Sequence, residues 1–403
     1  MAAAEIFHVD LANPPLNILI VEEHALIVFW WNDQPVGQTW NRGAKRRTVA
    51  VNQLTEQNVP PDIIRRASSV VTRPDGKPSA SVVICTRDRP EELARCLASF
   101  AQQTLVPNEI IVVDNASRDD RTWKAAVAAG TTYIREDRPG LDFARNAGAQ
   151  AASSDIVVYT DDDVRLHPRW LERMVAAFDA PHIAAVTGLV LPAELETEAQ
   201  RHFETYWAFG RGYRRLDFGP TFFTSDRYHG CAAWEIGAGA SMAFRQNVFR
   251  QIGLFDERLD VGQAGCSGDS EYWHRILSHG GTCRYEPSAV LFHYHRRDLS
   301  GLASQIFHYM RGHSAALMVQ FERTGNWGNI RRAFSTVPLW YARRIARGVL
   351  KGWTGADRFI GREIAGFASG IRFYFTQSRP KDIAREDTKL QKPTLPNEEI
   401  LGD

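Results

Sequence analysis

The sequence predicts an α/β protein with a mostly parallel central sheet, a small N-terminal β module and a helical C-terminal extension. Strand-like runs separated by turn signals fill the first part, strands alternate with helices from Ala80 onward, and from Ser300 the periodicity is helical alone. We therefore divide the chain into a β module at 1–52, a linker at 53–79, a central domain at 80–299, a helical extension at 300–376 and a polar tail at 377–403, which its composition predicts to be disordered.

The composition is that of a globular protein that can bury a large core, with 44% hydrophobic residues and a formal net charge of +1. The charge is uneven, since residues 331–385 hold twelve Lys or Arg against three acids. The five cysteines form no CxxC pair, which favours reduced thiols. There is no signal-peptide pattern and no apolar run of about 18 residues. We expect a cytoplasmic protein without a nucleic-acid partner, and peripheral contact with the inner face of the cell membrane stays open.

In the β module, strand-like runs at 17–21, 25–31 and 36–40 predict a small antiparallel sheet. A leading hairpin packed on the central domain explains the same pattern equally well. The linker is rich in proline, which predicts a short helix followed by an irregular connection.

The central domain begins with predicted strands at 81–85, 109–113 and 131–135, separated by helical segments. The second of these strands ends on Asp114. Ligands of open α/β sheets bind outside the carboxyl ends of the strands, so Asp114 is a candidate ligand contact, with a helix cap as the alternative role. A helix at 141–152 is rich in small residues, which let it lie close to the sheet.

A strand-like run at 155–164 stops on three consecutive carboxylates, Asp161, Asp162 and Asp163. Crowded carboxylates repel one another unless a cation compensates, and Mg²⁺ and Mn²⁺ take oxygen ligands of this kind. Arg145, on a helix entered from a glycine turn, suits diphosphate binding beside such a cation. The alternatives are a solvated acidic turn for the triplet and a surface ion pair for Arg145.

Four motifs in this order resemble the family-two glycosyltransferases: Val83–Arg89, Ile111–Ser117, Gly140–Gly148 and Asp161–Asp163. The resemblance implies the GT-A fold, with a nucleotide-sugar half at 80–190 and an acceptor half at 191–299. It further implies that Thr86 and Asp114 hold the base and ribose of the donor, that Arg87 and Arg145 are further donor contacts, that Asp161 or Asp162 contacts the ribose, and that Asp163 binds the metal.

In the acceptor half, a glycine-bearing loop leads into a helix at Asp269. Sugar transfer with inversion needs a base for the acceptor hydroxyl. Asp269 resembles the second acid of the family's Glu-Asp pair, in which Gly268 here replaces the Glu, and a helix N-cap is its alternative role. The predicted acceptor contacts are Trp234, Glu271 and Trp273.

A predicted strand at 287–297 places His293 and His295 on the same side, because side chains alternate along a strand. The family often has a His in this position, so we predict that His293 binds the metal beside Asp163. A hydrogen-bonded structural pair is the alternative. The resemblance implies Mn²⁺ or Mg²⁺ as the cofactor.

The helical extension contains a predicted amphipathic helix. Its apolar stripe comprises Val337, Tyr341, Ile345, Val349 and Trp353, and its basic side Arg343, Arg344, Arg347 and Lys351. Such a helix packs on the central domain or lies on an anionic membrane surface through residues 331–376, and both interpretations stay open.

The resemblance thus implies an inverting, hexosyltransferase-like enzyme. It would move a sugar from a UDP-, dTDP- or GDP-sugar to a hydroxyl of a glycan or a lipid-linked saccharide, as in polysaccharide biosynthesis for the cell envelope. One alternative is a nucleotidyltransferase of sugar phosphates, which would need a glycine-rich loop where Thr86–Pro90 has no glycine. A non-catalytic module that binds nucleotide sugars or glycans is the other.

Overall fold

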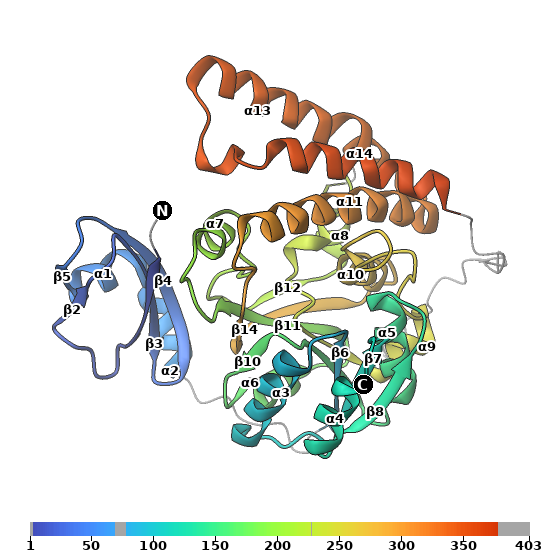
Figure 1. The fold of residues 1–403 in the computed structure, drawn as a ribbon, viewed down its shortest axis with the longest axis horizontal. Coiled ribbons are helices and arrows are strands. Elements are labelled where there is room, and N and C mark those ends of the chain that lie inside the picture. The colour runs from blue at the N-terminus through green and yellow to red at the C-terminus, as the bar shows by residue number, and fades with distance from the viewer. Residues whose placement is uncertain (1–2, 69–77, 227, 378–403) are drawn as a thin grey trace, which may run out of the picture.

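The structure is a computed structural model that describes residues 3–68, 78–226 and 228–377. The predicted disordered tail lies outside these residues, except for Gln377, and so does the middle of the predicted linker. The remainder forms a β module, a central α/β domain and a layer of long helices, as Figure 1 shows.

The N-terminal module is a mixed sheet rather than the antiparallel one that we predicted. Strand β1 (Ala4–Asp10), which the pattern did not indicate, runs parallel to β3 (His24–Trp31), and β4 (Gln34–Arg42) is antiparallel to β3. Strands β2 (Asn17–Ile20) and β5 (Arg47–Ala50) pair separately. Helices α1 (Val51–Asn58) and α2 (Pro61–Ser68) occupy the first part of the predicted linker.

The central sheet confirms the predicted α/β class. Its order is β10-β14-β11-β13-β9-β6-β7-β8, and the four strands β9, β6, β7 and β8 run parallel. The strands are β6 (Ala80–Thr86), β7 (Glu109–Asn115), β8 (Thr132–Glu136), β9 (Ile156–Asp161), β10 (Val164–Leu166), β11 (Ile183–Pro192), β12 (Leu216–Phe218), β13 (Ser241–Arg245) and β14 (Thr282–His293).

Helices cover both faces of the parallel half, which explains why β6 is a continuous apolar run. They are α3 (Pro90–Ala98), α4 (Arg121–Ala128), α5 (Leu141–Ala151) and α6 (Trp170–Ala176). Helix α5 lies against β6 at Gly148, where a Cβ atom would stand 2.3 Å from Cγ1 of Val83. The small residues of α5 therefore allow the close contact that the sequence predicts.

The carboxyl ends of β6, β7 and β9 meet at one edge of the sheet. Cys85 is paired with Asp161, and Thr86 with Asp114, so the polar residues that end these strands are neighbours. This register brings the first and last of the four sequence motifs together, although Arg89 and Asp161 are 72 positions apart along the chain.

The second half of the chain adds further helices. They are α7 (Glu198–Tyr206), α8 (Pro220–Ser225), α9 (Gln246–Ile252), α10 (Gly268–Ser278), α11 (Leu299–Thr324), α12 (Trp327–Arg331), a π-helical turn η3 (Arg332–Thr336), α13 (Val337–Lys351) and α14 (Ile360–Thr376).

Helices α11 and α14 lie side by side, and α13 protrudes from them (Figure 1). The contact is close because glycines of α14 meet the backbone of α11. A Cβ atom at Gly370 would lie 2.0 Å from the carbonyl oxygen of Arg311. Among the described residues, none of the helices combines the length and apolar character that crossing a bilayer requires.

Candidate active site

A cavity of about 1600 Å³ lies at the carboxyl edge of the parallel strands, beneath α11 and α13. Most residues that the sequence predicts for the site line it: Thr86, Arg87, Arg145, Asp161, Asp162, Asp163, Trp234, Asp269 and His293. Asp114, Glu271 and Trp273 do not line it. The cavity therefore brings together residues from both halves of the central domain.

One end of the cavity holds a candidate metal site. Asp161, Asp163 and His293 offer three ligand atoms that all lie within 4.8 Å of one another, and Nε2 of His293 is 3.2 Å from Oδ1 of Asp163. The antiparallel pairing of Val164 with His293 places this histidine beside the acids. Two carboxylates and an imidazole suit Mn²⁺ or Mg²⁺, so these residues fit the predicted cofactor.

The electrostatics of the triplet also favour a cation. Burial, together with the charge of Asp163, raises the pKa of both Asp161 and Asp162 to about 7. Burial opposes ionisation of Asp163 too, but the charges of His293 and Arg89 outweigh it and lower the pKa of that carboxyl. Burial lowers the pKa of His293 against the opposing effect of Asp163, and the neutral form that burial favours is the form of imidazole that binds a metal.

Arg89, which lies between β6 and α3, orients the carboxylates of the triplet, a role that we did not predict. Its Nη1 donates to Oδ1 of Asp162 and to Oδ2 of Asp163, both at 2.9 Å. The hydroxyl of Thr86 donates to Oδ2 of Asp162 at 2.7 Å. Thr86 and Arg89 therefore fix the orientation of Asp162, and Oδ1 of Asp163 remains directed at His293.

Asp114, a predicted donor contact, has structural partners instead. Asp114 is fully buried and accepts hydrogen bonds from the hydroxyl of Tyr133, from Nη1 of Arg135 and from the backbone of Ser117. Its position therefore does not support direct donor contact, because its oxygens are occupied behind the cavity wall.

Arg145 does reach the cavity wall but is buried between two acids. Its Nη1 donates to Asp142 at 2.8 Å and to Asp260 at 2.6 Å. The alternative prediction, that Arg145 forms an ion pair on the surface, is therefore wrong, because both of its ion pairs are buried. Arg145 therefore ties the loop before α10 to helix α5. This loop leads into α10, the helix that carries the candidate base Asp269.

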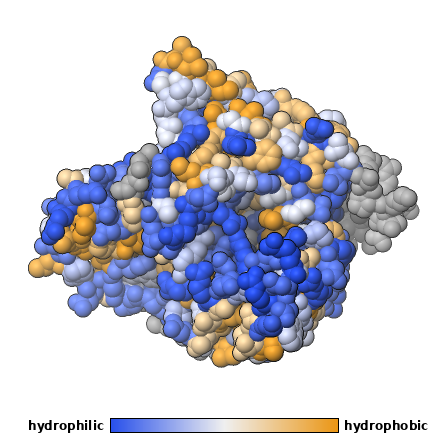
Figure 2. All heavy atoms as spheres, viewed as in Figure 1, coloured by the Kyte–Doolittle hydropathy of each residue, from blue (hydrophilic) through white to orange (hydrophobic). Residues whose placement is uncertain are grey.

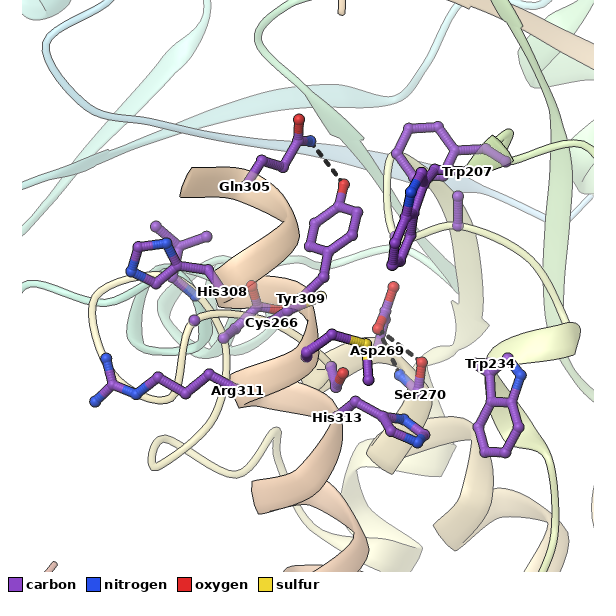
Figure 3. Close-up of a pocket in the computed structure, with 18 of the residues that line it drawn as sticks. Trp207, Trp234, Cys266, Asp269, Ser270, Gln305, His308, Tyr309, Arg311 and His313 are labelled. Atoms are coloured by element: carbon purple, nitrogen blue, oxygen red, sulfur yellow. Dashed lines mark hydrogen bonds between the residues drawn. The ribbon is translucent and has the colours of Figure 1, made fainter. Parts of the chain in front are cut away.

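Asp269 lies in the first turn of α10, whose N-cap position is Ser267. An N-cap role for Asp269 is therefore excluded. Its Oδ1 accepts hydrogen bonds from the backbone and hydroxyl of Ser270 (Figure 3). Burial, reinforced by the charge of Asp260, raises the pKa of Asp269 against the opposing effect of Arg145. A carboxylate with a raised pKa is a stronger base, as general-base catalysis requires.

Glycines shape the space around Asp269. A Cβ atom at Gly239 would lie 2.8 Å from its Oδ2, so glycine keeps this oxygen uncrowded. A Cβ atom at Gly268 would lie 2.0 Å from Oδ2 of Asp142. The departure from Glu at position 268 therefore has a packing reason, because no side chain fits there.

Two predicted acceptor contacts are corrected by the fold. Glu271 is fully buried and forms ion pairs with Arg275 and Arg323. Trp273 is fully buried in the main hydrophobic core. Successive helical residues are about 100° apart, so Glu271 points away from the face that carries Asp269.

Aromatic rings surround the candidate base, as Figure 3 shows for Trp207, Trp234 and Tyr309. The rings of Trp207 and Tyr309 are 6.3 Å apart, and that of Trp234 is 4.8 Å from the ring of His313. Of these four, we predicted only Trp234. Aromatic faces in a cavity beside a carboxylate suit the binding of a sugar.

Comparisons with known proteins agree with this geometry. Residues 81–249 match the family model described as glycosyl transferase family 2. An uncharacterised protein of Mycobacterium tuberculosis is 29% identical over 226 residues, which cover 54% of this chain and 67% of that protein. The pre-mycofactocin glycosyltransferase of the same species is 27% identical over 316 residues, covering 75% of this chain. The match spans only 60% of that relative's own length.

Among solved structures, the chain is similar to the mannosyltransferase PcManGT from Pyrobaculum calidifontis, which was determined in complex with GDP-Man and Mn²⁺. The TM-score is 0.51 with 17% sequence identity, and the match covers 77% of this chain and 92% of the other. This likeness concerns the fold, which is the GT-A fold that the resemblance implied.

Proposed function

We propose that the protein is a metal-dependent, inverting glycosyltransferase, and the match of residues 81–249 to the glycosyl transferase family 2 model supports this proposal. Its donor would be a nucleoside-diphosphate sugar and its acceptor a hydroxyl of a glycan or a lipid-linked saccharide. The observation that carries this proposal is that Asp269 and the cluster of Asp161, Asp163 and His293 line the same cavity. A base for the acceptor and a site for the donor's metal thus occur together.

The proposed reaction is a single displacement. Asp269 takes the proton of the acceptor hydroxyl, the hydroxyl oxygen bonds to the anomeric carbon, and the bond from that carbon to the diphosphate breaks. A divalent cation held by Asp161, Asp163 and His293 would neutralise the charge that develops on the departing diphosphate. Arg89 and Thr86 hold Asp162 in place during this change.

A panel of nucleotide sugars tests this function. We expect one donor to raise the melting temperature of the protein only when Mn²⁺ is present. NMR spectroscopy of the product formed from that donor should then show the anomeric configuration opposite to that of the donor. Retained configuration would exclude the single displacement. A binding module would give the thermal shift without release of nucleoside diphosphate, and a nucleotidyltransferase would release pyrophosphate from a nucleoside triphosphate.

We further propose that α13 docks on an anionic membrane surface. Part of its predicted basic side faces the protein, because Arg344 and Arg347 pair with Asp357. Its outer side is apolar and open, since Leu350 is 81% and Val349 70% exposed, and Figure 2 shows hydrophobic residues gathered at this protruding end. Such a surface would lie close to an acceptor carried by a lipid.

Replacing Leu350 with Asp should weaken binding to vesicles that contain phosphatidylglycerol by about tenfold or more, because the side chain would lose its apolar contact with lipid. Co-sedimentation measures this. The matched control is Val106→Asp, since Val106 is 78% exposed but belongs to the loop before β7. Equal binding by both variants, or no binding by the natural protein, would rule out docking through α13.

A further inference from the structure

Two arginines that line the cavity lack acidic partners. Arg89 and Arg145 on the donor side are each held by two carboxylates. Arg211 and Arg332, by contrast, form no ion pair with any acid among the described residues and instead donate to backbone carbonyls. No carboxylate contacts either guanidinium among the described residues, although the charge of Glu235 acts on both from farther away and that of Asp226 on Arg332.

Arg332 is presented by the π-helical turn η3, a rare element that often marks a functional position. Its Nε donates to the carbonyl of His229 at 2.6 Å and its Nη2 to that of Gly230 at 3.1 Å. Its Nη1 makes no hydrogen bond within residues 3–68, 78–226 and 228–377. The two carbonyls thus fix the guanidinium while leaving donors available to a ligand.

Arg211 and Arg332 converge on Trp234. Nη2 of Arg211 donates to the backbone carbonyl of Trp234 at 2.9 Å, and the guanidinium of Arg332 lies 4.7 Å from the centre of its ring. The same ring contacts His313, whose pKa is lowered by burial to about 4, so this imidazole adds no charge. The charge at this position is that of the two arginines, opposed only in part by the exposed carboxylate of Glu235, which does not contact them.

Burial of these cations has a cost. Desolvation lowers the pKa of Arg211 and of Arg332, although neither loses its proton at neutral pH. A half-buried guanidinium is best compensated by an anion that accepts two hydrogen bonds, and phosphate and carboxylate groups have this geometry. Trp234 and Asp269 line the same cavity, so such an anion would lie on the acceptor side.

We propose that Arg211 and Arg332 form an anion subsite, and that the acceptor carries a phosphate or carboxylate group that binds there. The assignment of this anion to the acceptor rests on the proposed function, whereas the subsite itself does not. The phosphate could belong to a soluble sugar phosphate or to a lipid-linked one, since the arginines recognise chemistry that both share.

Calorimetry on the full chain, with glycerol 3-phosphate as the probe and glycerol as the neutral reference, tests the subsite. EDTA in the buffer keeps the metal-dependent donor end from contributing. We expect glycerol 3-phosphate to bind and glycerol not to bind. Arg332→Gln should weaken the binding of glycerol 3-phosphate by about tenfold or more. Arg211→Gln, an independent variant, should weaken it as well.

The matched control is Arg343→Gln, because Arg343 on α13 does not line the cavity and its loss removes the same charge. It should leave the affinity unchanged. Glycerol 3-phosphate that binds no better than glycerol, or that binds Arg332→Gln and Arg211→Gln as tightly as the natural protein, would overturn the subsite.

A second arm replaces the probe with short-chain phosphatidic acid in micelles. Binding of this lipid that depends on Arg332 and exceeds that of glycerol 3-phosphate assigns the subsite to lipid-linked phosphates, and the reverse order assigns it to soluble ones. Sugar transfer without binding of either probe would remove the subsite and leave the proposed function intact. Binding of a probe without transfer from any donor would remove the proposed function and leave the subsite intact.

Discussion

Replacing Asp269 with Asn should reduce sugar transfer by about a thousandfold, while donor affinity should stay close to that of the natural protein. The amide keeps the size of the side chain but cannot take the proton of the acceptor hydroxyl, and removal of a general base has effects of this order. In the proposed complex the donor's diphosphate would bind at the other end of the cavity, so its affinity should not depend on Asp269. Release of nucleoside diphosphate measures the rate, and calorimetry measures the affinity.

The raised pKa of Asp269 adds a pH dependence to this expectation. The carboxylate is the active form, so the rate should fall as the pH is lowered through that raised pKa and should reach a plateau above it. The control is Asp137→Asn, which removes an exposed carboxylate of the loop between β8 and α5. Turnover of Asp269→Asn equal to that of this control would remove Asp269 from the base role.

Replacing Asp163 with Ala should weaken donor binding in Mn²⁺ by about a hundredfold and leave the weak binding in EDTA unchanged. Asp163 belongs to the three-residue cluster and shares its other oxygen with Arg89, so its loss removes one metal ligand.

Calorimetric titration of the donor with and without Mn²⁺ measures the effect of Asp163→Ala. Asp137→Ala is the control here, because it removes a carboxylate of equal charge outside the cavity. Donor affinity in Mn²⁺ that is the same in both variants would show that Asp163 does not support the metal.

The parallel half of the sheet was predictable because buried strands there are continuous β-branched runs that end on polar residues. The runs at 81–85 and 109–113 fall within β6 and β7, and the run at 155–164 contains β9 and ends at the first residue of β10. Strand β1 escaped prediction because its sequence, AEIFHVD, alternates weakly and has a half-buried pattern. Its pairing with β3 depends on tertiary contacts rather than on local propensity.

The site was predictable only where local motifs carry it. The Asp triplet and Asp269 lie at the end of a strand and at the start of a helix, so their surroundings indicate a ligand. Glu271 follows Asp269 closely in sequence, but the helix turns it toward Arg275 and Arg323. No local pattern marks these contacts.

Arg211 and Arg332 likewise could not be identified as site residues from local sequence patterns. They are 121 residues apart in the sequence, and only the folding of α12 and η3 over the cavity brings both to Trp234. Neither belongs to a motif, and the charge of Arg332 is part of a long basic segment. Their lack of acidic partners becomes visible only in three dimensions.

The central claim is that one cavity holds the donor's metal at Asp163 and the acceptor's base at Asp269. The most direct measurement determines donor affinity in Mn²⁺ and transfer rate for Asp163→Ala and Asp269→Asn side by side. We expect Asp269→Asn to lose transfer alone, whereas Asp163→Ala should lose both donor affinity and transfer. Donor affinity that falls equally in the two variants, or in neither, would contradict it.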